Sequence, residues 1–197
     1  MKDNACKICR REREKLLLKG DRCFTPKCAM VKRPYAPGQH GQNFRGKQSE
    51  YSKQLREKQK VKALYGVMET QLRNYYENAD KIEGKTTENL VTTLEKRLDN
   101  VIFRAGFASS RRESRQIASH GKATINGKRV TIPSVQVSEK DVIVVSPKKD
   151  TKIEKSKTPV WLNVDIKKMQ ITVSRLPVRE EIELAANESL VVEFYSR

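Results

Sequence analysis

The cysteines are the feature that most restricts how this chain can fold at its N-terminus. All four lie within residues 6 to 28, in the pattern Cys6-x2-Cys9-x13-Cys23-x4-Cys28. A gap of two residues lets two thiolates turn toward one point, and the longer gap then brings the second pair to the first. The spacing predicts a closed site of four thiolates, which is typical of a structural metal.

Zinc is the metal that we expect first, as one structural ion, because four thiolates satisfy its tetrahedral geometry. An iron–sulfur cluster uses the same ligand set, so the spacing does not choose between them. Two disulfides or four free thiols would also fit the spacing. Lys7, Arg10 and Lys27 would offset the negative charge of a metal with four thiolates. The segment has little apolar content, so a metal would supply folding energy that burial does not.

Positive charge is concentrated in the same third of the chain. The formal net charge of the 197 residues is +17. Residues 1–62 hold 18 Lys and Arg against 6 Asp and Glu, a balance of +12, and the rest of the chain has only +5. This asymmetry predicts a polyanionic partner. A membrane surface would need large apolar side chains opposite the lysines, whereas this third mixes Gly, Pro, Gln and His with its charges, which favours nucleic acid.

Residues 32 to 49, KRPYAPGQHGQNFRGKQS, contain two prolines and three glycines. This composition predicts an extended segment rather than a helix or a strand. An extended basic segment can follow a phosphate backbone without a core of its own. We expect the rings of Tyr35, His40 and Phe44 either to stack on exposed bases or to be buried in a local turn.

Residues 50 to 78 have apolar side chains at helical spacing, which predicts one or two amphipathic helices with a break at Gly66. We expect Tyr51, Leu55 and Met68 to pack in the core. The opposite face is basic, and it is either solvated or in contact with RNA. Its cations are Lys53, Arg56, Lys58, Lys60 and Lys62.

The segment from residue 90 to 105 carries an apolar stripe, which predicts one helix that ends at Gly106. A second helix is predicted to begin at Ser110, with Glu113 completing a capping box, and to stop at Gly121.

Strands are predicted after this helix. Asn126-Gly127 is a strong signal for a two-residue hairpin. Residues 142–145 and the sequences VWLNVDI and QITVSRL predict further strands, and the apolar spacing after Asn187 suits a short helix, although a strand also fits. The fold class that we expect is α+β.

The sequence gives little support to an enzyme. His40 and His120 are the only histidines, and no Cys or Asp stands near either of them. The chain lacks a Gly-rich phosphate loop, a paired-carboxylate motif and a nucleophile elbow. It also lacks an apolar run long enough for a membrane span and an N-terminal secretory signal, so we expect a cytoplasmic protein with neither a membrane nor a small-molecule substrate as partner.

Residues 97 to 143, from RLDNVIFRAGF to VQVSEKDVI, resemble the RNA-binding module shared by a small-subunit ribosomal protein, tyrosyl-tRNA synthetases and pseudouridine synthases. APGQHG (36–41), YSKQLREKQKVKALYGVMETQLRNYY (51–76), WLNVD and the C-terminal LVVEFYSR resemble the bacterial family of small-subunit ribosomal protein number four. The four-cysteine arm resembles the metal-binding version of that family.

This resemblance implies four ranges: a basic metal-binding arm (1–44), a helical rRNA-binding domain (45–93), an inserted RNA-binding module of two helices on a small antiparallel sheet, with following strands (94–173), and a C-terminal segment that completes the helical domain (174–197). It implies a structural constituent of the small subunit that binds 16S rRNA early, at a multi-helix junction of the 5′ domain, and nucleates assembly. It would lie near the channel through which mRNA enters, touch the fifth small-subunit protein and contribute to accuracy. A free-standing regulator and an RNA-modifying enzyme could each use the same module, and both stay open as second readings.

We expect the RNA contacts to come from basic residues, from polar residues of the second helix and from the turn glycines. The candidates are Lys7, Arg10, Arg11, Lys27, Lys32, Arg33, Tyr35, Gly38, His40, Gly41, Arg45, Lys53, Arg56, Lys58, Lys60, Arg104, Arg111, Arg112, Arg115, Gln116, Ser119, His120, Lys122, Asn126 and Lys128.

Overall fold

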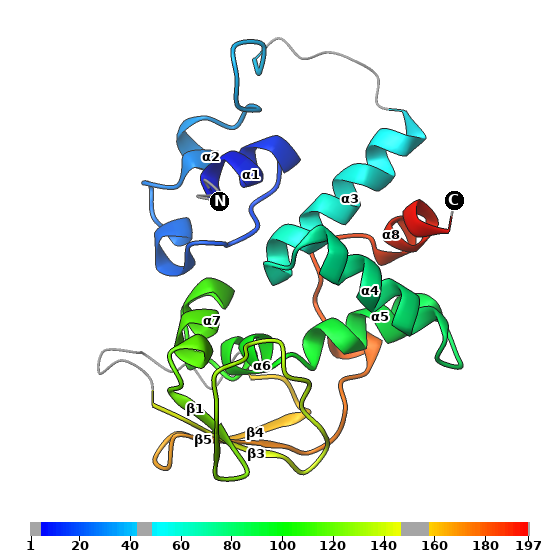
Figure 1. Cartoon of the computed structure of the whole chain (residues 1–197). Helices are drawn as coiled ribbons and strands as arrows, with labels where there is room; N and C mark the ends of the chain where they lie inside the picture. The colour runs from blue at the N-terminus through cyan, green and yellow to red at the C-terminus, as the bar shows by residue number, and fades with distance from the viewer. Residues whose placement is uncertain (1–4, 43–48, 147–157, 197) are drawn as a thin grey trace. The chain divides into compact units, whose positions relative to one another are not determined.

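The computed structural model describes residues 5–42, 49–146 and 158–196 (Figure 1). These residues form two compact units. The first contains the described residues up to Arg73 and those from Leu184 onward, and the second runs from Asn74 to Glu183. This division is coarser than the four predicted domain ranges, which stay a prediction.

The first unit begins with the cysteine arm. It consists of α1 (Ala5–Glu12), a 3-10 turn η1 (Gly20–Phe24) and the short α2 (Ala29–Lys32), which packs against α1. Leu16, Leu18 and three of the four cysteines are buried. The arm therefore removes several apolar side chains from solvent.

Two helices follow, as the break at Gly66 predicts. In α3 (Glu50–Tyr65) the Ser49 hydroxyl accepts a bond from the backbone N–H of Ser52, and Gly66 ends the helix with a φ of +61°. The second helix, α4 (Glu69–Asp80), spans the boundary between the units. The predicted core role of two residues is wrong, because 53% of Tyr51 and 73% of Met68 is exposed.

The C-terminal helix α8 (Glu188–Tyr195) packs along α3 (Figure 1). The Lys58 ammonium, almost fully buried, lies 4.2 Å from the centroid of the Phe194 ring and 2.5 Å from a carboxylate oxygen of Glu69. The Tyr195 hydroxyl donates to the same carboxylate at 3.0 Å. One buried cation thus joins α3, α4 and α8 through an ion pair and a cation–π contact.

Between the end of α4 and the sheet, the second unit has three helices: α5 (Thr86–Glu95), α6 (Leu98–Arg104) and α7 (Arg111–Ser119). The single helix expected over 90–105 is wrong, because the backbone at Arg97 leaves the helix. The N–H of Leu98 donates to the Val135 carbonyl, and the N–H of Val137 donates to the Lys96 carbonyl. Tertiary hydrogen bonds therefore divide a continuous apolar stripe.

The sheet contains five antiparallel strands in the order β2-β1-β3-β5-β4. They are β1 (Ala123–Ile125), β2 (Lys128–Val130), β3 (Val142–Val145), β4 (Leu162–Asp165) and β5 (Gln170–Val173). A 3-10 turn, η3 (Arg179–Glu181), comes after the last strand. The hairpin at Asn126-Gly127 and the strands at the three predicted places are confirmed.

Two helices, α6 and α7, supply the apolar residues that pack against the sheet. Val101, Ile102 and Ile117 are buried with side chains of the strands and with Trp161, which is 1% exposed. The expected mixture of helices with an antiparallel sheet is confirmed. It places α7 and the β1–β2 hairpin, which carry many of the candidate RNA contacts, on one rigid core.

Replacing Lys58 with methionine keeps the apolar packing of α8 but removes the cation from Phe194 and Glu69. We expect the docking of α8 to weaken by about 2 kcal/mol, the scale of a desolvated cation–π contact and a partly buried ion pair. Hydrogen exchange of the Val191 and Val192 amides measures this change.

The matched control is Lys53→Met on the same helix. Lys53 pairs with Glu50 at 2.7 Å in an exposed ion pair, which should contribute less than about 0.5 kcal/mol. Equal exchange rates in the two variants would contradict the role assigned to Lys58.

Candidate nucleic-acid interface

Arg10 and Tyr35, both predicted to contact RNA, contact each other. The Nε of Arg10 donates to the Tyr35 carbonyl at 2.9 Å, and its Nη2 donates to the Ala36 carbonyl at 3.3 Å. Its guanidinium carbon lies 5.0 Å from the centroid of the Tyr35 ring. Arg10 therefore connects α1 to Tyr35 and Ala36, in the segment that follows α2. The predicted arm cations with exposed side chains are Lys7, Arg11, Lys27, Lys32 and Arg33.

The four cysteines are free thiols, so the structure does not contain the two disulfides that the spacing would also allow. Cys9, Cys23 and Cys28 are buried and Cys6 is partly exposed. Burial raises the pKa of the Cys9 thiol, a backbone hydrogen bond at Leu16 opposes this rise, and the charges of the other three cysteines add to it. Among the described residues, however, no three His, Cys, Asp or Glu side chains are grouped so that they could hold a metal ion.

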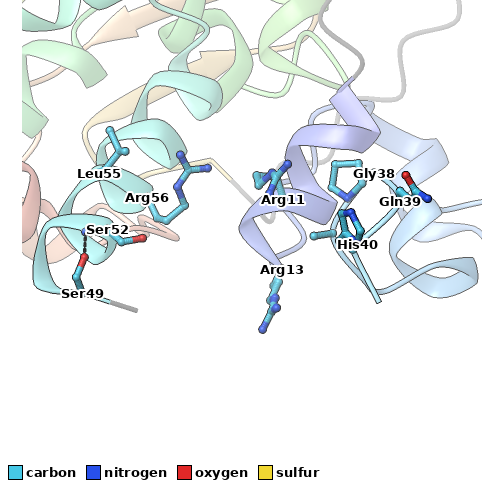
Figure 2. A pocket seen from close by; sticks show the side chains of 12 residues that line it. Arg11, Arg13, Gly38, Gln39, His40, Ser49, Ser52, Leu55 and Arg56 are labelled. Carbon is cyan, nitrogen blue, oxygen red and sulfur yellow. Dashed lines mark hydrogen bonds between the residues drawn. The ribbon is translucent and has the colours of Figure 1, made fainter. Parts of the chain in front are cut away.

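A hollow of about 870 Å³ lies between the arm and the start of α3 (Figure 2). Arg11 and Arg13 line one side, Ser52 and Arg56 line the other, and the 36–41 turn completes the wall. Among the described residues that line it, none is Asp or Glu. The basic lining and the size suit a phosphate with its sugar or base.

The turn that carries His40 requires glycine at two places. Gly38 has a φ of +107°, and a Cβ at Gly41 would stand 1.9 Å from the Ala36 carbonyl oxygen. The loop therefore closes on itself and leaves His40 exposed. Arg45, another candidate contact, lies outside the described residues.

The predicted basic face of α3 is largely compensated by carboxylates. Arg56 pairs with Glu12 at 3.1 Å, and Lys60 pairs with Glu14 at 2.8 Å. Lys53 and Lys58 have the partners described above. Burial raises the pKa of the Glu12 carboxyl, although Arg56 and Lys60 oppose that rise. Glu12 and Glu14 come from α1 and the residues just after it, so the spacing within α3 could not reveal these two partners. Glu50 and Glu57, by contrast, lie one turn from their cations within α3 itself.

In the second unit, Asp99 connects α6 to α7. Arg97, which is 1% exposed, donates from Nε and Nη2 to the two Asp99 oxygens at 3.0 and 2.8 Å, and from Nη1 to the Tyr75 hydroxyl at 2.6 Å. Arg115 of α7 donates from Nε to Asp99 at 2.9 Å. Burial acts to lower the pKa of Arg97, but Asp99 and Tyr75 outweigh it and keep the guanidinium charged.

Glu95, the last residue of α5, has the same role. This fully buried carboxylate accepts from Arg104 Nε and Nη2 at 2.9 and 2.8 Å and from Asn100 Nδ2 at 2.6 Å. Arg111 donates from Nε to Asn100 Oδ1 at 2.7 Å, and its guanidinium lies over Phe103. Three of the arginines predicted to contact RNA, Arg104, Arg111 and Arg115, are therefore also part of the protein's own polar network.

The outward side of α7 carries the remaining candidates. Arg112, Gln116 and Ser119 are exposed at one-turn spacing, followed by His120 and Lys122, and Lys128 is exposed at the hairpin. The Asn126 amide instead locks the hairpin: Nδ2 donates to Asp141 at 2.8 Å and Oδ1 accepts from the Val142 N–H at 2.9 Å. We call Arg112, Gln116 and Ser119 the α7 ridge, and its side chains are accessible to a polyanion.

Comparison with known proteins decides the family. Residues 1–95 match the family model described as ribosomal protein S4/S9 N-terminal domain, and residues 96–143 match the S4 domain. The chain is 53% identical to small ribosomal subunit protein uS4 of Thermodesulfovibrio yellowstonii, over 98% of this chain and 96% of that protein. It belongs to the ribosomal protein uS4 family.

Two other members of the family have a similar sequence identity to this chain. The chain is 54% identical to uS4A of Alkaliphilus oremlandii, over 98% of this chain and 96% of that protein, and 51% identical to uS4 of Clostridioides difficile, over 98% and 97%. The match extends over nearly the whole of each protein. A protein that shared only the RNA-binding module would match over that module alone. None of the helices in the described ranges is apolar over a length that would span a membrane.

Arg115→Ala should lower the free energy of unfolding of the second unit by about 2 kcal/mol, because it removes a charge-assisted partner from a buried carboxylate. Arg112→Ala, its exposed neighbour on α7, should change stability by less than about 0.5 kcal/mol. Urea unfolding followed by the emission of Trp161, the single tryptophan, measures both. If Arg112→Ala lowered the free energy of unfolding as much as Arg115→Ala, the stabilising contact of Arg115 with the buried carboxylate would be contradicted.

Proposed function

We propose that this protein is a structural constituent of the small ribosomal subunit, that it binds 16S rRNA directly and early, and that it is not an enzyme. The observation that carries this proposal is the match to uS4 proteins over 98% of the chain. The protein would act on the ribosome in the cytoplasm and would touch neighbouring small-subunit proteins, notably the fifth. A position at a 5′-domain junction near the channel through which mRNA enters, with an effect on accuracy, is part of the same proposal.

The distribution of charge supports RNA as the partner. The exposed arm cations, the basic hollow with His40 and the α7 ridge present cations and hydrogen-bond donors, and the described residues that line the hollow include no carboxylate. Basic residues on such surfaces neutralise phosphates and release counterions, which gives affinity that falls steeply with salt. Folded RNA hides most base edges in a deep groove, so shape and backbone contacts would give much of the specificity.

The arm offers a direct test of this surface. Replacing Lys7, Arg11 and Lys27 together with alanine should weaken binding to a 16S rRNA transcript and reduce the slope of log K against log salt by about 2 to 3. Filter binding at a series of KCl concentrations measures both. The matched control replaces Lys81, Lys167 and Lys168, exposed cations outside the proposed surface, and should keep the wild-type slope.

Two outcomes would count against the proposal. If the arm variant kept the wild-type slope of log K against log salt, the arm would not be part of the RNA-binding surface. Native protein that sediments only in the soluble fraction, never with small subunits, would overturn the ribosomal function itself.

We also propose that Cys6, Cys9, Cys23 and Cys28 hold one structural zinc ion, with an iron–sulfur cluster as the second candidate. The ligand spacing supports this proposal, and three of the four thiols are buried. Bound zinc would fix the arm as a rigid platform for Lys7 and Arg11. The chemistry is structural, since four thiolates leave no position for substrate.

Protein purified without added metal should contain about one zinc per chain by elemental analysis. Removal of the metal with a strong chelator should make the arm sensitive to protease, because structural zinc contributes on the order of 10 kcal/mol to such small folds. The second unit should be unaffected, with unchanged Trp161 emission. Protein with neither zinc nor iron would exclude both metals.

A further inference from the structure

Arg129 is a basic residue of the second unit that sequence patterns do not single out. It lies in β2, opposite Thr124 of β1, and its side chain is exposed. Its Nε donates to the Gly121 carbonyl at 3.1 Å, and its Nη2 donates to the His120 carbonyl at 3.4 Å. The sheet therefore fixes the backbone of Arg129, and the turn from α7 to β1 fixes its guanidinium.

The acceptors of Arg129 orient its guanidinium without neutralising it. Arg97, Arg104 and Arg115 each have a carboxylate oxygen at 2.8 Å. In the part of the chain that the structure describes, Arg129 forms no such ion pair, and its partners are two carbonyls at the C-terminal end of a helix. A carbonyl is a dipole and does not cancel a unit charge. A guanidinium has five N–H donors, so donors remain for another acceptor.

Gly121 makes this arrangement possible. Its φ of +67° is the left-handed conformation that ends α7. A Cβ at this position would stand 2.3 Å from the Nε of Arg129 and 2.5 Å from its Nη2. A side chain at position 121 would therefore displace the guanidinium from the carbonyls, even where the backbone itself tolerated the change.

We propose that Arg129, held by the α7–β1 turn, binds a backbone phosphate of RNA and that Gly121 is the residue that positions it. Lys122, exposed and adjacent to Gly121 in the chain, supplies a second cation at the same turn. A planar guanidinium fork matches two phosphate oxygens, and a free arginine loses much rotamer freedom when it binds one. Arg129 has already lost that freedom on folding, so its contact is stronger than that of an unrestrained surface cation.

This inference rests on the proposed rRNA-binding function, and the test separates the two. The affinity of the full-length protein for a 16S rRNA transcript is measured between about 0.1 and 0.4 M KCl. Arg129→Gln, which keeps an amide donor for the carbonyls but loses the charge, should bind about 10-fold more weakly at the lowest salt, with a slope reduced by about 1. The control Lys168→Ala, an exposed cation of the β4–β5 turn, should match wild type.

Two further variants test positioning rather than charge. Arg129→Lys keeps the charge but cannot reach two carbonyls with a fork, and Gly121→Asn keeps the left-handed turn but displaces the arginine. Both should keep the wild-type slope and bind several-fold more weakly. Wild-type affinity in both would overturn the positioning role of Gly121, and an unchanged slope in Arg129→Gln would overturn the phosphate contact. Failure of wild type itself to bind the transcript would instead contradict the proposed function.

Discussion

The buried carboxylate of Asp99 is the interaction on which the second unit depends. Arg97 reaches it from the break between α5 and α6, and Arg115 reaches it from α7. A charge at this depth is stable only when its partners are in place and hydrogen-bonded, so the pair constrains both helices at once. The backbone around it also bonds to residues 133–137, which fixes the long connection between β2 and β3.

The same network shows how a strongly basic protein remains folded without losing its binding surface. Glu95 and Asp99 together accept from arginines of α6, α7 and the α5–α6 break. Cations that are paired inside the protein define its geometry, whereas Arg112, Lys122 and Arg129, outside this network, face solvent. Self-repulsion among the exposed cations is the cost of this arrangement, and a polyanionic partner relieves it.

In the first unit, α3 has a comparable role. Acids of the arm pair with its outward cations, and Lys58 anchors α8 on its other side. The helix is therefore a scaffold to which both ends of the chain are attached. The start of α3, the end of α1 and the 36–41 turn together line the basic hollow, so no single segment of the sequence could form it (Figure 2).

Features that depend on neighbouring residues could be predicted from the sequence. The cap at Ser110, the break at Gly66 and the hairpin at Asn126 are all local, because their hydrogen bonds join residues a few positions apart. Composition likewise revealed the basic N-terminal third, and the motifs revealed the family. These properties belong to short stretches of chain and do not require a tertiary structure.

Only the tertiary structure decided which cations are accessible and where the stripe over residues 90–105 divides. In the sequence, three arginines resemble a phosphate-binding face: Arg104, Arg111 and Arg115. In the structure, carboxylates bind Arg104 and Arg115, and a side-chain amide binds Arg111. Arg129 has no motif around it, yet the carbonyls at the end of α7 hold it in place. The physical reason is that an ion pair or a guanidinium–carbonyl contact acts over a few ångströms of space, and folding alone determines which side chains come that close.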